Sequence, residues 1–248
     1  MESVDESTKD WRKEKITFRA AYGDERMTAF LFLPKGKTSP YQVVLWFPGS
    51  DAIHQRSSES IWMEPIDFVI KSGRAVCFPI YKGTYERRTD LKDDNPEKTS
   101  FYRDHVIMWS KDIGRTIDYL ETRPDLDTKK LAYYGTSWGA GMGAIFPALE
   151  KRFKVAVLDG GGFWPQPALP EADQRTFAPR VKIPVLMLNG RYDNFFPLQT
   201  SQIPMFQAFS TPQKDKRHVI LEAGHWVERN DRIREILDWL DRYLGPVK

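Results

Sequence analysis

A serine, an aspartate and a histidine of this chain occur in contexts that are typical of nucleophilic catalysis. Ser137 is the centre of Gly-Thr-Ser-Trp-Gly at residues 135–139, which has the form G-x-S-x-G. Asp193 ends the sequence Asn-Gly-Arg-Tyr-Asp, and His225 ends Glu-Ala-Gly-His. A serine hydroxyl attacks a carbonyl only when a base takes its proton, and a carboxylate can orient that base. These residues therefore predict a nucleophile, an acid and a base.

The surroundings of Ser137 predict a sharp turn from a strand into a helix. The run 131–134 is apolar and precedes the motif, whereas small residues follow it. Gly135 and Gly139 have no Cβ, so the strand and the helix can approach each other closely. Such a turn holds the serine at an unfavourable backbone angle and exposes its hydroxyl at the carboxyl end of a sheet. The alternative interpretation is an ordinary helix N-cap serine in a glycine-rich turn.

Other residues compete for the roles of acid and base. Asp159, which ends the preceding predicted strand, is the second candidate for the acid. The other candidate bases are His54, His105 and His218. His54 could border the site, and His105 opens a helix. His218 begins a strand and therefore belongs at the far edge of the sheet. His225 is preferred because it follows the last strand in a turn that can place it over the serine.

The oxyanion that forms during attack on a carbonyl needs preorganised N–H donors. The first expected donor is the backbone N–H of Trp138, directly after the nucleophile. The second is expected from the loop 48–51, Pro-Gly-Ser-Asp, where Ser50 is the preferred residue. The alternative interpretation of this loop is an ordinary tight turn.

Aromatic residues stand close to these positions in the sequence and are expected to line a substrate pocket. Trp226 directly follows the candidate base, Phe195 and Phe196 follow the candidate acid, and Trp164 lies after the sixth predicted strand. Rings in a pocket would favour an apolar or aromatic acyl or alcohol group. Packing in the hydrophobic core is the alternative for each of them.

Composition bears on the partners and the location of the protein. The net charge of +3 is not concentrated in a basic tract, so nucleic acid is not an expected partner. No stretch approaches the length of a membrane span, and we expect no membrane partner. The charged N-terminus and the single Cys77 are typical of a cytoplasmic protein. No histidines have metal-ligand spacing, so neither a metal nor another cofactor is expected.

The order of the predicted elements indicates an α/β fold. A polar lead-in at 1–14 precedes a single domain at 15–248, which opens with an antiparallel hairpin and continues with alternating strands and helices. This alternation predicts a mainly parallel sheet of about eight strands, with helices on both faces and no large lid. The predicted strands are 15–22, 26–33, 41–47, 74–80, 130–134, 154–158, 184–188 and 218–221. The predicted helices are 58–72, 105–122, 138–149, 198–209 and 229–244. The polar segment 81–104 is predicted as an irregular loop that could cap the cleft or lie elsewhere.

With these motifs, the chain resembles the α/β-hydrolases, and within them the dienelactone hydrolase and prolyl-oligopeptidase-like branch. It is more closely similar to the hydrolase domain found at the C-terminal end of some bacterial serine/threonine protein kinases. The matching stretches are KITFRAAYGDERMTAFLFLPKG, WFPGSDAIHQRSS, AYYGTSWGAGMGAI, FAPRVKIPVLMLNGRYDNFFP and LDWLDRYLGP. The resemblance implies Ser137, Asp193 and His225 as a catalytic triad. It also implies either one portion of a longer, kinase-linked protein or a free-standing relative.

The chain departs from these families at two points that bear on its activity. Dienelactone hydrolases use a cysteine nucleophile where this chain has Ser137, and prolyl oligopeptidases carry a propeller for which 248 residues leave no room. We therefore expect a serine carboxylesterase whose partner is a small-molecule ester with a short or aryl acyl group. The alternatives are a serine peptidase for small peptides, which would need an acidic pair or an arginine to hold a peptide N-terminus, and a non-catalytic regulatory module. The oligomeric state is left open.

Overall fold

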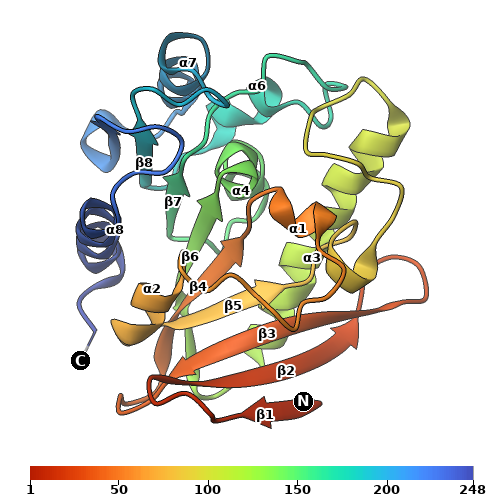
Figure 1. The fold of residues 1–248 in the computed structure, drawn as a ribbon, viewed down its shortest axis with the longest axis vertical. Coiled ribbons are helices and arrows are strands. Elements are labelled where there is room, and N and C mark those ends of the chain that lie inside the picture. Colours follow the sequence, from red (N-terminus) through yellow and green to blue (C-terminus); the bar gives the residue numbers. More distant parts are fainter. Residues whose placement is uncertain (248) are drawn as a thin grey trace.

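A computed structural model describes residues 1–247 of the chain, and these residues form one nine-stranded sheet (Figure 1). The strands lie in the order β1-β2-β3-β5-β4-β6-β7-β8-β9. Pairing is antiparallel from β1 to β5 and parallel from β5 to β9. The strands are β1 (Ser3–Asp5), β2 (Trp11–Arg19), β3 (Arg26–Pro34), β4 (Tyr41–Phe47), β5 (Ala75–Pro79), β6 (Leu126–Thr136), β7 (Val155–Asp159), β8 (Val185–Gly190) and β9 (Lys216–Leu221).

The hydrophobic pattern explains both halves of this sheet. The hairpin strand β2 alternates buried and half-buried residues, as expected for a strand with one covered face. The strands β5, β7 and β8 are buried along their whole length, because helices cover both faces of the parallel half. All eight predicted strands are present, and the mainly parallel α/β-hydrolase fold is confirmed.

The ninth strand lies in the segment predicted as a lead-in. β1 pairs antiparallel with Lys13–Lys15 of β2, and β2 itself starts at Trp11. Half of residues 1–14, namely 3–5 and 11–14, therefore lie in strands, which a loose lead-in does not describe. The three residues of β1 are all exposed, so backbone hydrogen bonds and not apolar burial hold this edge. No hydrophobic pattern in the sequence marks such a strand.

Helices cover both faces of the sheet. In Figure 1, α2 and α8 lie on one side, and α3 and α4 on the other. The α-helices are α1 (Asp51–His54), α2 (Asp67–Lys71), α3 (Ser100–Glu121), α4 (Trp138–Met142), α5 (Phe146–Leu149), α6 (Gln174–Phe177), α7 (Ile203–Ala208) and α8 (Arg229–Leu244). Shorter turns are η1 (Tyr85–Arg87), η2 (Ala178–Arg180), η3 (Leu198–Gln202) and η4 (Gln213–Asp215). The described residues contain no separate lid domain, and none of their helices is both long and apolar enough to cross a membrane.

Three predicted helices differ from the structure for local reasons. The helix predicted at 58–72 is reduced to α2, which starts two residues after Pro65. Proline lacks the N–H that a helix needs and restricts the residue before it. The helix predicted at 138–149 is divided into α4 and α5, with Pro147 near the start of α5. The helix predicted at 105–122 starts earlier, at Ser100, because the Thr99 hydroxyl accepts a hydrogen bond from the backbone N–H of Tyr102 at 3.2 Å.

Candidate active site

The turn that carries Ser137 joins β6 to α4 and is as tight as its glycines indicate. Ser137 has φ 49° and ψ −108°, a region that residues with a side chain rarely adopt. A Cβ on Gly135 would lie 2.2 Å from the Gly139 carbonyl oxygen, and a Cβ on Gly139 would lie 2.2 Å from the Phe47 carbonyl oxygen. Only glycine fits at either position. The strained turn predicted from the sequence is therefore present, and Ser137 itself is half-buried.

Backbone hydrogen bonds hold this turn on the neighbouring strands. The Ser137 N–H donates to the Asp159 carbonyl at 2.8 Å, at the end of β7. The Gly139 N–H donates to the Pro48 carbonyl at 3.0 Å, just beyond β4. The Ser137 side chain makes no helix-capping hydrogen bond, so the N-cap interpretation does not describe it.

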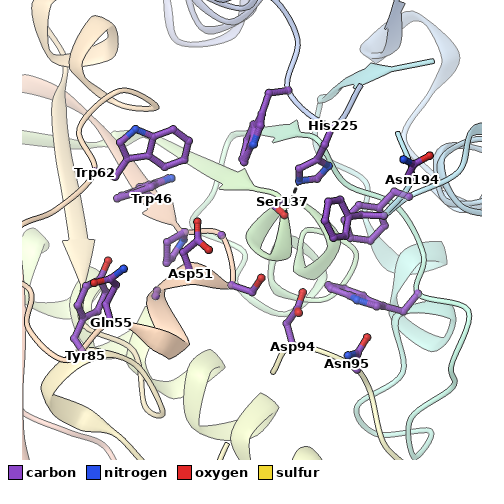
Figure 2. Close-up of a pocket in the computed structure, with 18 of the residues that line it drawn as sticks. Trp46, Asp51, Gln55, Trp62, Tyr85, Asp94, Asn95, Ser137, Asn194 and His225 are labelled. Atoms are coloured by element: carbon purple, nitrogen blue, oxygen red, sulfur yellow. Dashed lines mark hydrogen bonds between the residues drawn. The ribbon is translucent and has the colours of Figure 1, made fainter. Parts of the chain in front are cut away.

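Ser137, His225 and Asp193 form one hydrogen-bonded chain (Figure 2). Ser137 Oγ lies 2.9 Å from His225 Nε2, and His225 Nδ1 lies 2.8 Å from Asp193 Oδ2. Because an ionised carboxylate only accepts hydrogen bonds, the imidazole donates from Nδ1 and accepts the serine proton at Nε2. The Asp193 side chain is fully buried, and its other oxygen accepts the backbone N–H groups of Phe195 and Phe196 at 2.8 and 3.1 Å. The acid is therefore fixed in place on both sides.

The competing histidines have other partners. His105 lies between the Thr89 hydroxyl, at 2.8 Å, and the Phe101 carbonyl, at 2.9 Å. His218 contacts Asn189 Oδ1 at 3.1 Å, and burial lowers the pKa of His218 to about 4. His54 is exposed at the end of α1. None of these three rings has a hydrogen bond to the candidate nucleophile among the described residues.

Asp159, the second candidate for the acid, lies close to the site but is not hydrogen-bonded to His225. Its carboxylate accepts a hydrogen bond from the Tyr134 hydroxyl at 3.2 Å and faces Arg232, with Asp159 Oδ2 3.8 Å from Arg232 Nη1. The structure thus places Asp193, and not Asp159, against the imidazole.

Two backbone N–H groups beside Ser137 are free to bind an oxyanion. Within residues 1–247, neither the Trp138 N–H nor the Ser50 N–H has a hydrogen-bond acceptor. Gly49 brings the Ser50 loop against the nucleophile, since a Cβ on Gly49 would lie 3.6 Å from Ser137 Cβ. The Trp138 indole points away into the core and packs edge-on against Phe47. Its backbone, and not its ring, therefore faces the site.

A pocket of about 720 Å³ opens above Ser137 and His225. All four aromatic residues expected from the sequence line it, namely Trp164, Phe195, Phe196 and Trp226. Trp164 and Phe196 are almost fully buried, whereas Phe195 is 71% exposed at the rim. Trp62 and Trp226 contact each other edge-to-face, with ring centroids 5.5 Å apart. The aromatic residues thus form both the inner wall and the mouth of the pocket.

Polar residues that the sequence analysis did not assign to the pocket also line it. They are Asp51, Gln55, Ser60, Asp94, Asn95, Gln166 and Asn194. Figure 2 shows Asp51, Trp46 and Trp62 on one side of Ser137 and Asn194 on the other, with Asp94 and Asn95 below it. The last two belong to the segment 81–104, which therefore borders the cleft. Its unusual length was the only signal in the sequence for this role.

Two carboxyl groups, those of Asp51 and Asp94, line the pocket without a basic partner. No Lys or Arg is among its lining residues, and within the described chain neither Asp51 nor Asp94 forms a salt bridge. Burial raises the pKa of the Asp94 carboxyl, and hydrogen bonds from its surroundings, including the Ser50 hydroxyl, oppose this increase. Burial and the nearby Asp51 charge raise the pKa of Tyr85 to about 12, so its hydroxyl stays neutral.

The fold and the strained serine turn define the class of the protein as an α/β-hydrolase. The chain belongs to the dienelactone hydrolase family, whose model matches residues 27–234. The cysteine of this chain, Cys77, lies fully buried in β5, where burial raises the pKa of its thiol far above the usual value. It is not in the strained turn between β6 and α4, where this chain has Ser137.

Solved structures of low sequence identity share the fold. A cold-adapted esterase from an Arctic intertidal metagenomic library is 18% identical, with a TM-score of 0.71 over 99% of this chain and 100% of its own. Acetyl xylan esterase from Paenibacillus sp. R4 is 16% identical, with a TM-score of 0.73 over 97% and 87%. A candidate dipeptidyl aminopeptidase IV from Bacteroides ovatus is 16% identical, with a TM-score of 0.73 over 96% of this chain but 36% of its own. No curated protein was found to match this chain in sequence. The family supports a hydrolase, and these structures share its fold.

Proposed function

We propose that the protein is a serine carboxylesterase that hydrolyses esters with short or aryl acyl groups. The observation that carries this proposal is the hydrogen-bonded chain from Asp193 through His225 to Ser137, in a strained turn, with two free N–H groups beside it. These are the parts that an acyl transfer needs: a nucleophile, an oriented base and a site for the oxyanion.

The reaction would proceed through an acyl-enzyme. Ser137 Oγ attacks the ester carbonyl carbon while His225 Nε2 takes the serine proton, and the backbone N–H groups of Trp138 and Ser50 bind the oxyanion. The intermediate then loses the alcohol, whose oxygen receives the proton from His225. Water next attacks the acyl-enzyme, with His225 again as the base, and releases the acid. Asp193 holds the imidazole and stabilises its protonated form throughout.

The shape of the pocket supports short or flat acyl groups. Trp164 and Phe196 contact each other at 5.2 Å between ring centroids and close one wall. Gly141 lies directly behind the Trp164 ring, since a Cβ there would be 2.3 Å from it, so the indole has no room to move back. A long flexible chain therefore has no channel in this direction, whereas an acetyl or aromatic group can lie against the rings.

Rates on p-nitrophenyl esters from acetate to decanoate test this proposal. We expect the highest kcat/KM at short acyl length and a loss of activity in Ser137→Ala. Ser210→Ala, an exposed serine outside the pocket, is the matched control and should retain full activity. A rate that persists in Ser137→Ala would contradict the proposal. If no ester is hydrolysed and a fluorophosphonate does not label Ser137, the non-catalytic interpretation is favoured instead.

A second candidate function is a serine peptidase that acts on peptides with a free N-terminus. Two observations favour it: Asp51 and Asp94 place carboxylates without basic partners in the pocket, and a candidate dipeptidyl aminopeptidase shares the fold. An ammonium group could bind between such carboxylates and the aromatic faces. Hydrolysis of alanyl-naphthylamide but not of its N-acetyl derivative would support this function. The preference should then fall in Asp51→Asn and Asp94→Asn, but not in Asp93→Asn, which alters an exposed acid outside the pocket.

A further inference from the structure

A chain of charged side chains runs outward from a buried pair, Asp159 and Arg232, close to the candidate triad. Asp159 at the end of β7 is 1% exposed, and Arg232 on α8 is 3% exposed. Arg232 faces the Asp159 carboxylate with one nitrogen and bonds Glu64 with another. Glu64 also bonds Arg229, which pairs with Asp67 at the more exposed end. Buried charges are costly unless paired, so this arrangement gains little stability over apolar packing and invites a functional explanation.

Asp159, at the inner end of these charged side chains, and the next residue contact both Ser137 and His225 through their backbone. The Asp159 carbonyl accepts the Ser137 N–H at 2.8 Å. The next residue, Gly160, has φ +73°, and a Cβ on it would lie 3.5 Å from His225 Cε1 and 3.3 Å from the His225 carbonyl oxygen. The backbone of Asp159 and Gly160 therefore contacts both Ser137 and His225.

The Asp159 carboxylate has an oxygen without a partner. Oδ2 accepts the Tyr134 hydroxyl, while Oδ1 is buried and has no hydrogen bond within the described residues. The charged or titratable groups around it are Tyr134 from β6, Arg232 from α8, Glu64 from the segment before α2, and His225 from the turn after β9. Burial raises the pKa of Asp159 to about 6, despite the charge of Arg232. The carboxylate is therefore ionised near pH 8 and loses its charge in weak acid.

We propose that Asp159 is a positioning residue that, through its buried negative charge and its backbone, favours the protonated form of His225 during the reaction. Glu64, Arg232 and Asp159 carry a net charge of −1 when all are ionised, and the outer pair of Arg229 and Asp67 adds none. Asp159 and Glu64 do not line the pocket, so this charge acts on His225 from outside the substrate site. It supplements Asp193, which contacts the ring directly. The inference rests on the proposed esterase function.

Asp159→Asn tests this role, because asparagine has the same shape and leaves Arg232 paired with Glu64. We expect kcat for p-nitrophenyl acetate to fall about fivefold at pH 8, because the imidazolium that forms in the transition state loses a neighbouring negative charge. Such a charge shifts the pKa of a nearby group by a fraction of a pKa unit or more. KM should stay within error, because Asp159 does not line the pocket. The acid limb of the kcat profile should move to lower pH by about half a unit, as protonated His225 loses a favourable neighbour.

Asp67→Asn is the matched control, because it removes a carboxylate from the outer end of the same row of charged side chains. It should leave the acid limb in place. A role in stability alone would lower the denaturation midpoint of Asp159→Asn without moving this limb, and that result would overturn the proposal.

The ¹H NMR titration of the His225 ring separates this inference from the proposed function. The chain has four histidines, so His225→Gln assigns the signal, and no substrate is needed. A lower titration midpoint in Asp159→Asn than in wild type supports the inference even if no ester is hydrolysed, in which case the proposed function alone fails. An unchanged midpoint overturns the inference, whatever the kinetics show.

Discussion

Gly139→Ala should disrupt catalysis by separating the two halves of the candidate oxyanion site. The new Cβ would lie 2.2 Å from the Phe47 carbonyl oxygen and 2.7 Å from its carbon, whereas ordinary contact begins near 3.4 Å. Both partners are backbone, so β4 and α4 must move apart by roughly 1 Å. The loop after β4 carries the Ser50 N–H and α4 carries the Trp138 N–H, so this movement changes the distance between the two donors.

The expected loss follows from this displacement. A misplacement of about 1 Å can reduce a catalysed rate about 100-fold, and we expect a loss of this size in kcat/KM. Lost packing and the lost Gly139 to Pro48 hydrogen bond should also lower the free energy of unfolding by roughly 1–3 kcal/mol. Hydrolysis of p-nitrophenyl acetate and urea unfolding of the same preparation measure the two effects.

Gly224→Ala is the control for this prediction, because Gly224 precedes His225 and a Cβ there would meet nothing within 4 Å. Its activity should remain within about twofold of wild type, and its stability should rise slightly because alanine restricts the unfolded chain. If Gly139→Ala and Gly224→Ala have the same kcat/KM, the close approach of Gly139 to Phe47 does not hold the two oxyanion donors in place, which contradicts this prediction.

Three other perturbations have defined outcomes. Ser50→Pro keeps the φ angle of −66° but removes the N–H, so kcat should fall about 100-fold or more. Ser50→Ala keeps the N–H and should retain most activity. Equal effects of the two substitutions would show that the Ser50 N–H does not bind the oxyanion. Asp193→Asn cannot hold the required imidazole tautomer, so kcat at pH 7 should fall by roughly three to four orders of magnitude, and a loss below tenfold would contradict its role. His218 has its pKa lowered from 6.5 to about 4 in the folded chain, so the unfolded chain takes up a proton first as the pH falls. The free energy of unfolding should therefore decrease by roughly 2 kcal/mol between pH 6.5 and pH 4 on account of this residue, and His218→Gln, compared by urea unfolding, should lack that part of the decrease.

The predictions that succeeded rest on local constraints. The turn at Ser137 was predictable because its glycines occur between an apolar strand and a small-residue helix, and only that context requires them. The core strands were predictable because apolar runs such as 155–158 in β7 and 185–188 in β8 can be stable only inside a covered sheet. His225 was preferred over His218 because it follows the last strand, and its ring lies 2.9 Å from Ser137 Oγ, whereas its role as the base stays a prediction.

The features that were missed depend on contacts between distant segments. β1 forms through backbone pairing with Lys13–Lys15 and has no buried side chain. Asp94 reaches the pocket because the long segment 81–104 passes beside the Ser50 loop, which no local pattern reveals. The partners of Asp159 come from β6, α8 and the segment before α2, so its surroundings could not be inferred from the residues around it.

Covalent trapping tests the central claim, that Ser137 is a nucleophile activated by His225. Wild-type protein would be treated with diethyl p-nitrophenyl phosphate, with release of p-nitrophenolate followed in solution and the adduct located by peptide mass spectrometry. Our account predicts one equivalent of p-nitrophenolate and one adduct, on Ser137, formed at least 100-fold more slowly in His225→Asn. An unmodified Ser137, an adduct on another residue, or an equal rate in His225→Asn would contradict it.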